Sequence, residues 1–170
     1  MIQLDRHTLI EKRQAITGQQ RRTKEQAIIQ KITPFLKGNV AAYSPIRGEV
    51  DLLSFLDHRN IYLPCTVDEN RIAFYPISKT MHKGAFQVME PIRSHEIEPE
   101  ELDVILVPLV GFKDCFRIGY GKGYYDRYLP RTKAVKIGVA FDCQEMESIE
   151  IKPTDVELDM VVTESRIIRR

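Results

Sequence analysis

The apolar positions in the first part of the chain follow a helical period. Between residues 28 and 36 they recur at the spacing that puts them on one face of a helix. Thr17 and Gln20 fit a capping box at the start of this helix, and Gly38-Asn39 marks its end. Another helix is expected before it, from about residue 4 to 16. The chain therefore begins with an N-terminal helical segment.

After residue 39 the pattern changes to short apolar stretches separated by polar turns. We expect strands at 40–43, 61–63, 71–75, 86–89, 104–107, 136–141 and 160–162. Short helices are expected from Asp51 toward His58 and from about Tyr124. Residues 104–107 are apolar throughout, which is typical of a parallel strand buried on both faces. This alternation predicts an α/β fold with a mostly parallel central sheet.

Composition narrows the class of protein. The chain has 170 residues, of which 43% are hydrophobic and 29% charged, so we expect one globular domain over residues 1–170. A formal net charge of +1 argues against a general nucleic-acid or membrane-surface binder. No apolar run approaches the ~20 residues of a membrane span, and the first residues lack the apolar stretch of a signal peptide. The three cysteines form no C-x-x-C pair. We expect a cytoplasmic monomer without nucleic-acid or membrane partners.

The near-neutral total hides two segments of opposite charge. Residues 111–136 hold seven Lys and Arg against two Asp, a net charge of +5. Residues 142–164 hold eight acidic side chains against one Lys, a net charge of −7. Such a pair suits an anionic ligand held together with a cation, and it equally suits two complementary solvated faces. Charge alone leaves both interpretations open.

The stretch Arg-Ile-Gly-Tyr-Gly-Lys-Gly-Tyr-Tyr-Asp at 117–126 carries the strongest chemical signal. Three alternating glycines weaken a helix or a strand, but they allow a loop to turn its N–H groups toward an oxyanion. The stretch follows the strand at 104–107 and opens a helix, which is where α/β sheets bind phosphates. It matches neither a P-loop nor a dinucleotide fingerprint. The pattern favours phosphate binding over a flexible structural turn.

These residues, together with Tyr128-Leu129, resemble the signature of the 5-formyltetrahydrofolate cyclo-ligases, also called 5,10-methenyltetrahydrofolate synthetases. Further similarity to that family lies at 103–108, 43–45, 48–51, 137–142 and 155–164. The resemblance spans nearly the whole chain in the same order. It implies a Rossmann-like layered fold, in agreement with the alternation of helices and strands.

The resemblance also implies an activity, the ATP- and Mg²⁺-dependent cyclisation of 5-formyltetrahydrofolate to 5,10-methenyltetrahydrofolate with release of ADP and phosphate. Such chemistry needs positioning and charge stabilisation, and no Ser/His/Asp or Cys/His set is required. Lys122 matches the catalytic position, and Asp126 and Asp155 match the magnesium ligands. The implied ATP-binding residues are Arg6, Arg117, Ile118, Gly119, Tyr120, Gly121, Lys122, Gly123, Tyr124 and Tyr125. The implied substrate-binding residues are Ser44, Glu49, Tyr120 and Tyr124.

The chain departs from the family pattern at two positions. Ile2 stands where a Lys usually precedes the Arg by four residues, so either Arg13 or another cation substitutes or ATP binds more weakly. Cys65 stands where many relatives have Arg, beside the substrate pocket. Two other functions stay open: a non-catalytic folate- or nucleotide-binding regulator of one-carbon metabolism, and an isomerase or transferase acting on a sugar phosphate.

Overall fold

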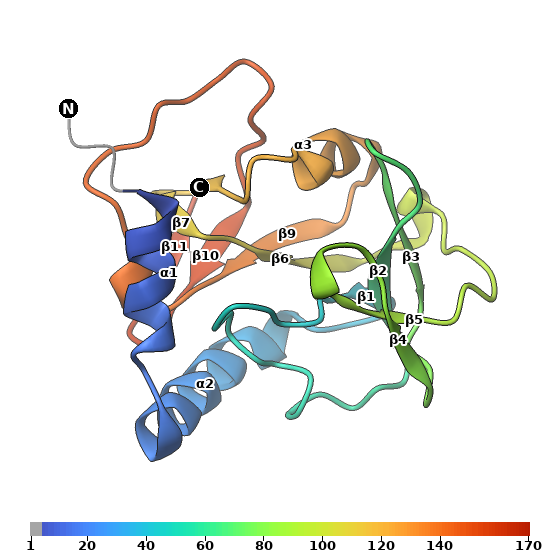
Figure 1. The fold of residues 1–170 in the computed structure, drawn as a ribbon, viewed down its shortest axis with the longest axis horizontal. Helices are drawn as coiled ribbons and strands as arrows, with labels where there is room; N and C mark the ends of the chain where they lie inside the picture. Colours follow the sequence, from blue (N-terminus) through green and yellow to red (C-terminus); the bar gives the residue numbers. More distant parts are fainter. Residues whose placement is uncertain (1–4) are drawn as a thin grey trace.

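A computed structural model describes residues 5–170 and shows a seven-stranded sheet at the centre of the protein (Figure 1). In spatial order its strands are β11 (Ile167–Arg169), β10 (Met160–Val162), β9 (Val135–Val139), β6 (Val104–Pro108), β1 (Val40–Ala41), β2 (Ile61–Thr66) and β3 (Ile72–Pro76). The five strands from β10 to β2 are parallel, and β11 and β3 pair antiparallel at the two edges. Two hairpins lie outside the sheet: β4 (Met81–Lys83) with β5 (Met89–Pro91), and β7 (Gly111–Lys113) with β8 (Phe116–Ile118). The predicted fold class is confirmed.

Helices cover both faces of this sheet. The α-helices are α1 (Arg6–Gln14), α2 (Gly18–Ile32) and α3 (Tyr124–Tyr128). Short 3₁₀ turns are η1 (Thr33–Phe35), η2 (Ala85–Gln87), η3 (Pro99–Glu101), η4 (Leu129–Arg131) and η5 (Asp142–Gln144). In Figure 1, α2 lies below the sheet and α3 above it. Over residues 5–170, none of the helices combines the length and the apolar character that crossing a bilayer requires.

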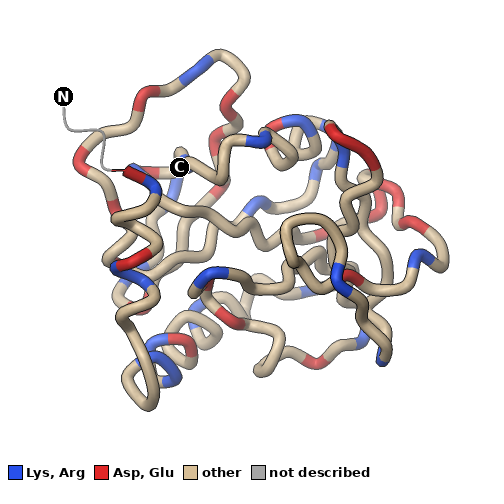
Figure 2. Tube along the Cα trace, viewed as in Figure 1, with Lys and Arg blue, Asp and Glu red and all other residues tan. Residues whose placement is uncertain are grey.

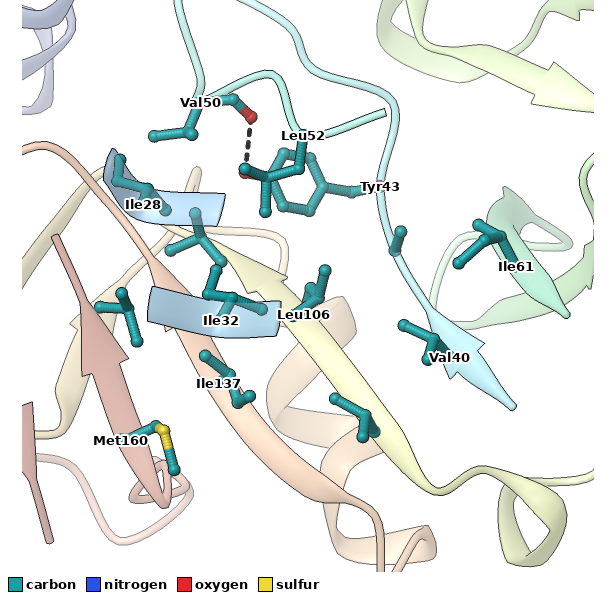
Figure 3. Packing of buried hydrophobic residues seen from close by; sticks show 14 of the residues in the cluster. Ile28, Ile32, Val40, Tyr43, Val50, Leu52, Ile61, Leu106, Ile137 and Met160 are labelled. Carbon is teal, nitrogen blue, oxygen red and sulfur yellow. Dashed lines mark hydrogen bonds between the residues drawn. The ribbon is translucent and has the colours of Figure 1, made fainter. Parts of the chain in front are cut away.

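The core consists of two apolar layers separated by the sheet. Figure 3 shows Ile28 and Ile32 of α2 over Leu106 and Ile137, in the layer on one face. The next residue along β6, Val107, belongs to the other layer, because successive strand side chains point to opposite faces. All of Val104 to Val107 are buried. The prediction of a strand buried on both faces is therefore confirmed.

Three local predictions are wrong. Thr17 precedes α2 but makes no side-chain capping bond, and Gly18, the first residue of the helix, has a left-handed φ of +58°. The segment after Asp51 forms turns instead of a helix, and the Asp51 N–H bonds to the Glu25 carboxylate at 2.7 Å. The strand expected at 86–89 begins only at Met89, because Phe86 has a left-handed φ of 57°.

The boundaries of the other elements shift by a few residues. The first helix starts at Arg6, and the expected start at Leu4 lies outside the described residues. Strand β2 continues through Pro64 to Thr66, and β9 ends at Val139. The hairpin strands β4, β7 and β8 and the edge strand β11 were not predicted as strands at all.

Candidate active site

The connections of the sheet create a crevice at its centre. From β1 the chain moves to β2 on one side, whereas from β6 it moves to β9 and β10 on the other. The strand order thus reverses between β1 and β6, and ligands of open α/β sheets bind outside the carboxyl ends of the strands at such a point. A pocket of about 580 Å³ lies there. Tyr43 and Ser44, just after β1, and Pro108, at the end of β6, line it.

The pocket brings together every residue that the sequence analysis selected for the site. Those lining it are Arg6, Ser44, Glu49, Arg117, Ile118, Gly119, Tyr120, Gly121, Lys122, Gly123, Tyr124, Tyr125, Asp126 and Asp155. They come from α1, from the loop after β1, from the β8–α3 connection and from the loop before β10. Their placement agrees with one shared site, and the role of each stays a prediction.

The glycine loop at 117–125 is shaped by two left-handed residues. Gly121 has a φ of +97° and Gly123, the residue before α3, a φ of +71°, conformations that favour glycine. The Arg6 Nε donates a 2.6 Å hydrogen bond to the Gly119 carbonyl, so α1 is tied to the loop. Lys122 is exposed at the pocket, with its Nζ 5.5 Å from the centre of the Phe86 ring. The loop therefore places glycine backbone and an exposed cation, Lys122, at the same pocket.

Arg117, in β8 at the start of this loop, is a buried cation. Its side chain is only 6% exposed, its Nη1 donates to the Pro108 carbonyl at 3.2 Å, and its Nη2 lies 3.9 Å from the Asp126 carboxylate. Burial lowers the pKa of the Arg117 guanidinium, against the influence of Asp126 and other nearby acidic groups. Its Nε is buried without a hydrogen-bond partner in residues 5–170. Arg117 also lines the pocket, so it adds positive charge to the site.

Glu49 is a buried carboxylate that also lines the pocket. It is 6% exposed and accepts hydrogen bonds from the Ile46 N–H at 2.9 Å and from the Tyr120 hydroxyl at 3.3 Å. Burial raises the pKa of Glu49 from 4.5 to about 7, and the Ile46 bond and the Arg13 charge oppose that rise. The site thus holds a carboxyl group that changes charge near neutral pH.

Asp126 and Asp155 meet at the pocket although they lie far apart in the sequence. Asp155 belongs to the loop between η5 and β10, which also contributes Glu150, Lys152 and Thr154 to the lining. Figure 2 shows acidic positions spaced along this loop, which arches toward α3. The charged segments noted in the sequence therefore meet, in part, at one site. Within residues 5–170 no three His, Cys, Asp or Glu side chains are grouped to hold a metal. Two carboxylates fit Mg²⁺, which keeps water and substrate phosphates as its remaining ligands.

Arg13 and Glu90 occupy places that the sequence did not predict. Arg13 is 0% exposed and its donors are bound within the fold, so it does not stand in the pocket as a substitute for the expected N-terminal Lys. Ile2, where that Lys was expected, lies outside the described residues. Arg13 lies four residues after the buried Leu9, and this charge on an apolar helix face was the available signal. Glu90 lines the pocket, is buried, and accepts a 2.9 Å bond from the Thr66 N–H.

Cys65 lies behind the pocket wall. Its strand neighbours Pro64 and Thr66 line the pocket, whereas Cys65 points to the other face and is buried. Its Sγ lies 3.6 Å from the Pro91 carbonyl. Burial raises the pKa of the thiol to about 11, so it stays protonated and unreactive at neutral pH. Cys65, which stands where many relatives have Arg, therefore does not line the pocket.

Comparison with known proteins agrees with the geometry. The model of the 5-formyltetrahydrofolate cyclo-ligase family matches residues 3–164. A 5-formyltetrahydrofolate cyclo-ligase of Mycoplasma pneumoniae is 33% identical over 94% of this chain and 96% of its own length, and that of Escherichia coli K12 is 27% identical over 98% of both. The structure of the 5,10-methenyltetrahydrofolate synthetase of Aquifex aeolicus superimposes with a TM-score of 0.82 and 34% identity, covering 96% of this chain and 90% of that one. The structure of a 5,10-methenyltetrahydrofolate synthetase of M. pneumoniae gives a TM-score of 0.75 with 31% identity, covering 94% of this chain and 96% of that one. The chain therefore belongs to the 5-formyltetrahydrofolate cyclo-ligase family.

Proposed function

We propose that this protein catalyses the ATP- and Mg²⁺-dependent cyclisation of 5-formyltetrahydrofolate to 5,10-methenyltetrahydrofolate, with release of ADP and phosphate. One observation carries the proposal. A single pocket joins a cationic glycine loop suited to phosphates with a buried carboxylate, Glu49, suited to the N–H groups of a pterin. The names of the relatives and structural neighbours support the same reaction.

The reaction requires activation of a poor leaving group. Transfer of the γ-phosphoryl group of ATP to the formyl oxygen gives ADP and an N5 iminium phosphate, so that oxygen becomes part of a leaving group. The neighbouring N10 amine then attacks the formyl carbon and loses its proton to the solvent, and the C–O bond breaks as phosphate departs. Both steps gain chiefly from alignment of the two substrates and from stabilisation of negative charge. A pocket that holds both substrates without a protein nucleophile meets this requirement.

The glycine loop supplies the groups for ATP. Its glycines allow the backbone N–H groups to surround an oxyanion, and the buried Arg117 guanidinium adds positive charge to the same pocket. Lys122 carries no salt bridge within residues 5–170, so its ammonium group is available to the transferring phosphoryl group. Arg6 reaches the loop through the Gly119 carbonyl and adds a positive charge at its edge. Asp126 and Asp155 would hold Mg²⁺, which when bound neutralises charge on the phosphates.

Other residues that line the pocket supply the groups for the folate. Ionised Glu49 accepts hydrogen bonds and would take two pterin N–H groups through its remaining lone pairs. The Ser44 hydroxyl donates to the Met89 carbonyl at 2.7 Å, so its oxygen remains free to accept from the substrate. Tyr124 and Phe86 line the same pocket, with ring centres 6.5 Å apart, and give apolar surface for a flat ring.

The decisive experiment mixes the purified full chain with 5-formyltetrahydrofolate, ATP and Mg²⁺ and follows the near-ultraviolet absorbance of the methenyl product. We expect absorbance to rise only when all three are present, with one ADP formed per product. Product formed without ATP, or tight binding of both substrates without turnover, would reject the proposal.

A further inference from the structure

Arg13 is a buried cation that donates hydrogen bonds both to the backbone and to a side chain of the site. Its Nε donates to the Arg47 carbonyl at 2.9 Å and its Nη1 to the Leu109 carbonyl at 2.8 Å. Its Nη2 donates to the Tyr120 hydroxyl at 2.5 Å. Two of these bonds hold the backbone on either side of the pocket. The third goes to a side chain that lines it.

The bond from Arg13 sets the direction of the next one. A guanidinium has only donors, so the Tyr120 oxygen must accept from Arg13. The hydroxyl has a single proton, which is then free to point at Glu49 Oε2, 3.3 Å away. A chain of two bonds thus runs from Arg13 through Tyr120 to Glu49. Tyr120 belongs to the glycine loop, whereas Glu49 lies in the loop after β1. These two hydrogen bonds therefore also connect two loops that line the pocket.

Several charged or titratable groups surround Glu49 from the elements packed against it. They are Arg13 of α1, Tyr43 just after β1, Arg117 of β8, Tyr120 of the glycine loop and Tyr125 of α3. Of these, Tyr120 is the one that donates a side-chain hydrogen bond to the carboxylate in the described chain. The tyrosines at 43 and 125 stay neutral at physiological pH because burial raises the pKa of each hydroxyl. The two arginines and the Tyr120 bond therefore favour the ionised form of Glu49.

We propose that Arg13 is a positioning residue for the folate-binding carboxylate, acting through the Tyr120 hydroxyl to keep Glu49 ionised and correctly oriented. This inference rests on the proposed function, because it assigns Arg13 a task only if Glu49 binds the folate. It explains why an arginine occupies the apolar face of α1 beside Leu9. It also gives Tyr120 a role on the folate side of the pocket in addition to its place in the ATP loop.

The test compares Tyr120→Phe, Arg13→Lys and Arg13→Met with the wild-type full chain. We measure the Kd for 5-formyltetrahydrofolate by calorimetry between pH 6 and 9, and KM and kcat at saturating ATP. In the wild type, folate binding should weaken as pH falls through about 7, where Glu49 gains a proton. Tyr120→Phe removes one lowering influence on the pKa of Glu49, so that midpoint should move to higher pH. At pH 7 its folate KM should rise about tenfold or more, the effect of losing one bond to a charged group, and this rise should exceed any fall in kcat.

The Arg13 variants test whether both residues act in series. Arg13→Met should also move the midpoint upward and weaken folate binding. Adding Tyr120→Phe to it should weaken binding by less than about twofold more, because the hydroxyl then lacks the group that orients it. Arg13→Lys keeps the charge but cannot form the three-way fork, and we expect an intermediate shift. If Arg13→Met fails to fold, Arg13→Lys and Tyr120→Phe still carry the comparison.

A matched control is Lys12→Met, which removes one positive charge from the preceding, exposed position of the same helix. Its midpoint should equal that of the wild type. An equal shift in Lys12→Met and Arg13→Met, an unmoved midpoint in Tyr120→Phe, or independent effects in the double variant would overturn the inference. These outcomes differ from failure of the proposed function, in which the wild type itself would form no methenyl product.

Discussion

Replacing Glu49 with Gln should improve the stability of the unliganded protein while damaging folate binding. In the unfolded chain the carboxyl group ionises with a pKa of 4.5, whereas in the folded protein burial raises the pKa to about 7. Between these values the folded state binds more protons than the unfolded state, so the free energy of unfolding falls as pH rises. The gap corresponds to about 3 kcal/mol, and that whole penalty is present above pH 7.

Gln keeps the shape of the side chain and carries no charge at any pH, so it escapes this penalty. The Ile46 N–H retains its acceptor, because an amide oxygen can replace the carboxylate oxygen there. At pH 8 the variant should be more stable by up to about 3 kcal/mol, which for a chain of this size raises Tm by roughly 6–12 °C. At pH 4, below both pKa values, the two proteins should melt within about 2 °C of each other.

The assay is thermal denaturation of both proteins from pH 4 to 9, followed by far-ultraviolet circular dichroism. In parallel, folate KM should rise about 10- to 150-fold, since a charge-assisted hydrogen bond contributes about 1.5–3 kcal/mol. ATP binding should stay near the wild-type value. A Tm difference that is the same at pH 4 and pH 8 would refute the reasoning, because the penalty belongs to the ionised group alone. Equal weakening of ATP and folate would show that Glu49 supports the whole pocket instead.

Further substitutions test Lys122, the two aspartates and the packing around Glu90. Lys122→Ala should lower kcat at least about 100-fold in the absorbance assay with little change in folate Kd, and a variant with full kcat would leave Lys122 as a solvated loop cation. Asp126→Asn and Asp155→Asn should each require far more Mg²⁺ for half-maximal rate, and the double variant should need little more than the worse single one; unchanged Mg²⁺ dependence would remove that residue from the metal site. Gly84→Ala should lower the free energy of unfolding by about 1–3 kcal/mol in urea denaturation, because a Cβ there would lie 2.1 Å from the buried Glu90 carboxyl carbon, and unchanged stability would mean that this carboxylate moves freely.

The parts of the fold that follow from local patterns were predictable. The apolar stretch of β6 needs burial on both faces, and only a central parallel strand provides it. The alternating glycines require a loop, and their place between a buried strand and a helix puts that loop at the ligand-binding edge. The family resemblance added Glu49, Ser44 and Asp155, which carry no distinctive local pattern. All of them line the same pocket as the glycine loop.

The features that depend on distant partners were not predictable. The β4–β5 hairpin is short, and its connection contains left-handed Phe86 and Gln87, which interrupt the alternation that a strand requires. Edge strand β11 holds only three residues and is defined by its pairing with β10. The bond from Arg13 to Tyr120 spans 107 residues of sequence. The sequence pattern around Arg13 or around Tyr120 does not indicate a contact between them.

Hydrogen bonds from two helices hold the turn that carries the buried Glu49. The two residues before it adopt left-handed φ values, 48° at Arg47 and 80° at Gly48, so the turn is conformationally demanding. Arg13 of α1 bonds to the Arg47 carbonyl, and Arg21 of α2 bonds to the Gly48 carbonyl at 2.9 Å. Two helices therefore fix the turn from outside, before any ligand arrives.

The bonds from Arg13 and Arg21 favour folate binding because they order Glu49 in advance. A carboxylate that is already ordered loses little conformational freedom when the folate binds, and one that is already desolvated exchanges few water contacts. The packing of the two N-terminal helices against the core thus holds Glu49 buried and ordered before the folate binds. Arg21→Met should accordingly weaken folate binding through loss of order in the turn, while the pH midpoint of that binding stays closer to wild type than in Tyr120→Phe. Calorimetry across the same pH range separates these two effects, because disorder lowers affinity at every pH, whereas a change in the pKa of Glu49 moves the curve along the pH axis.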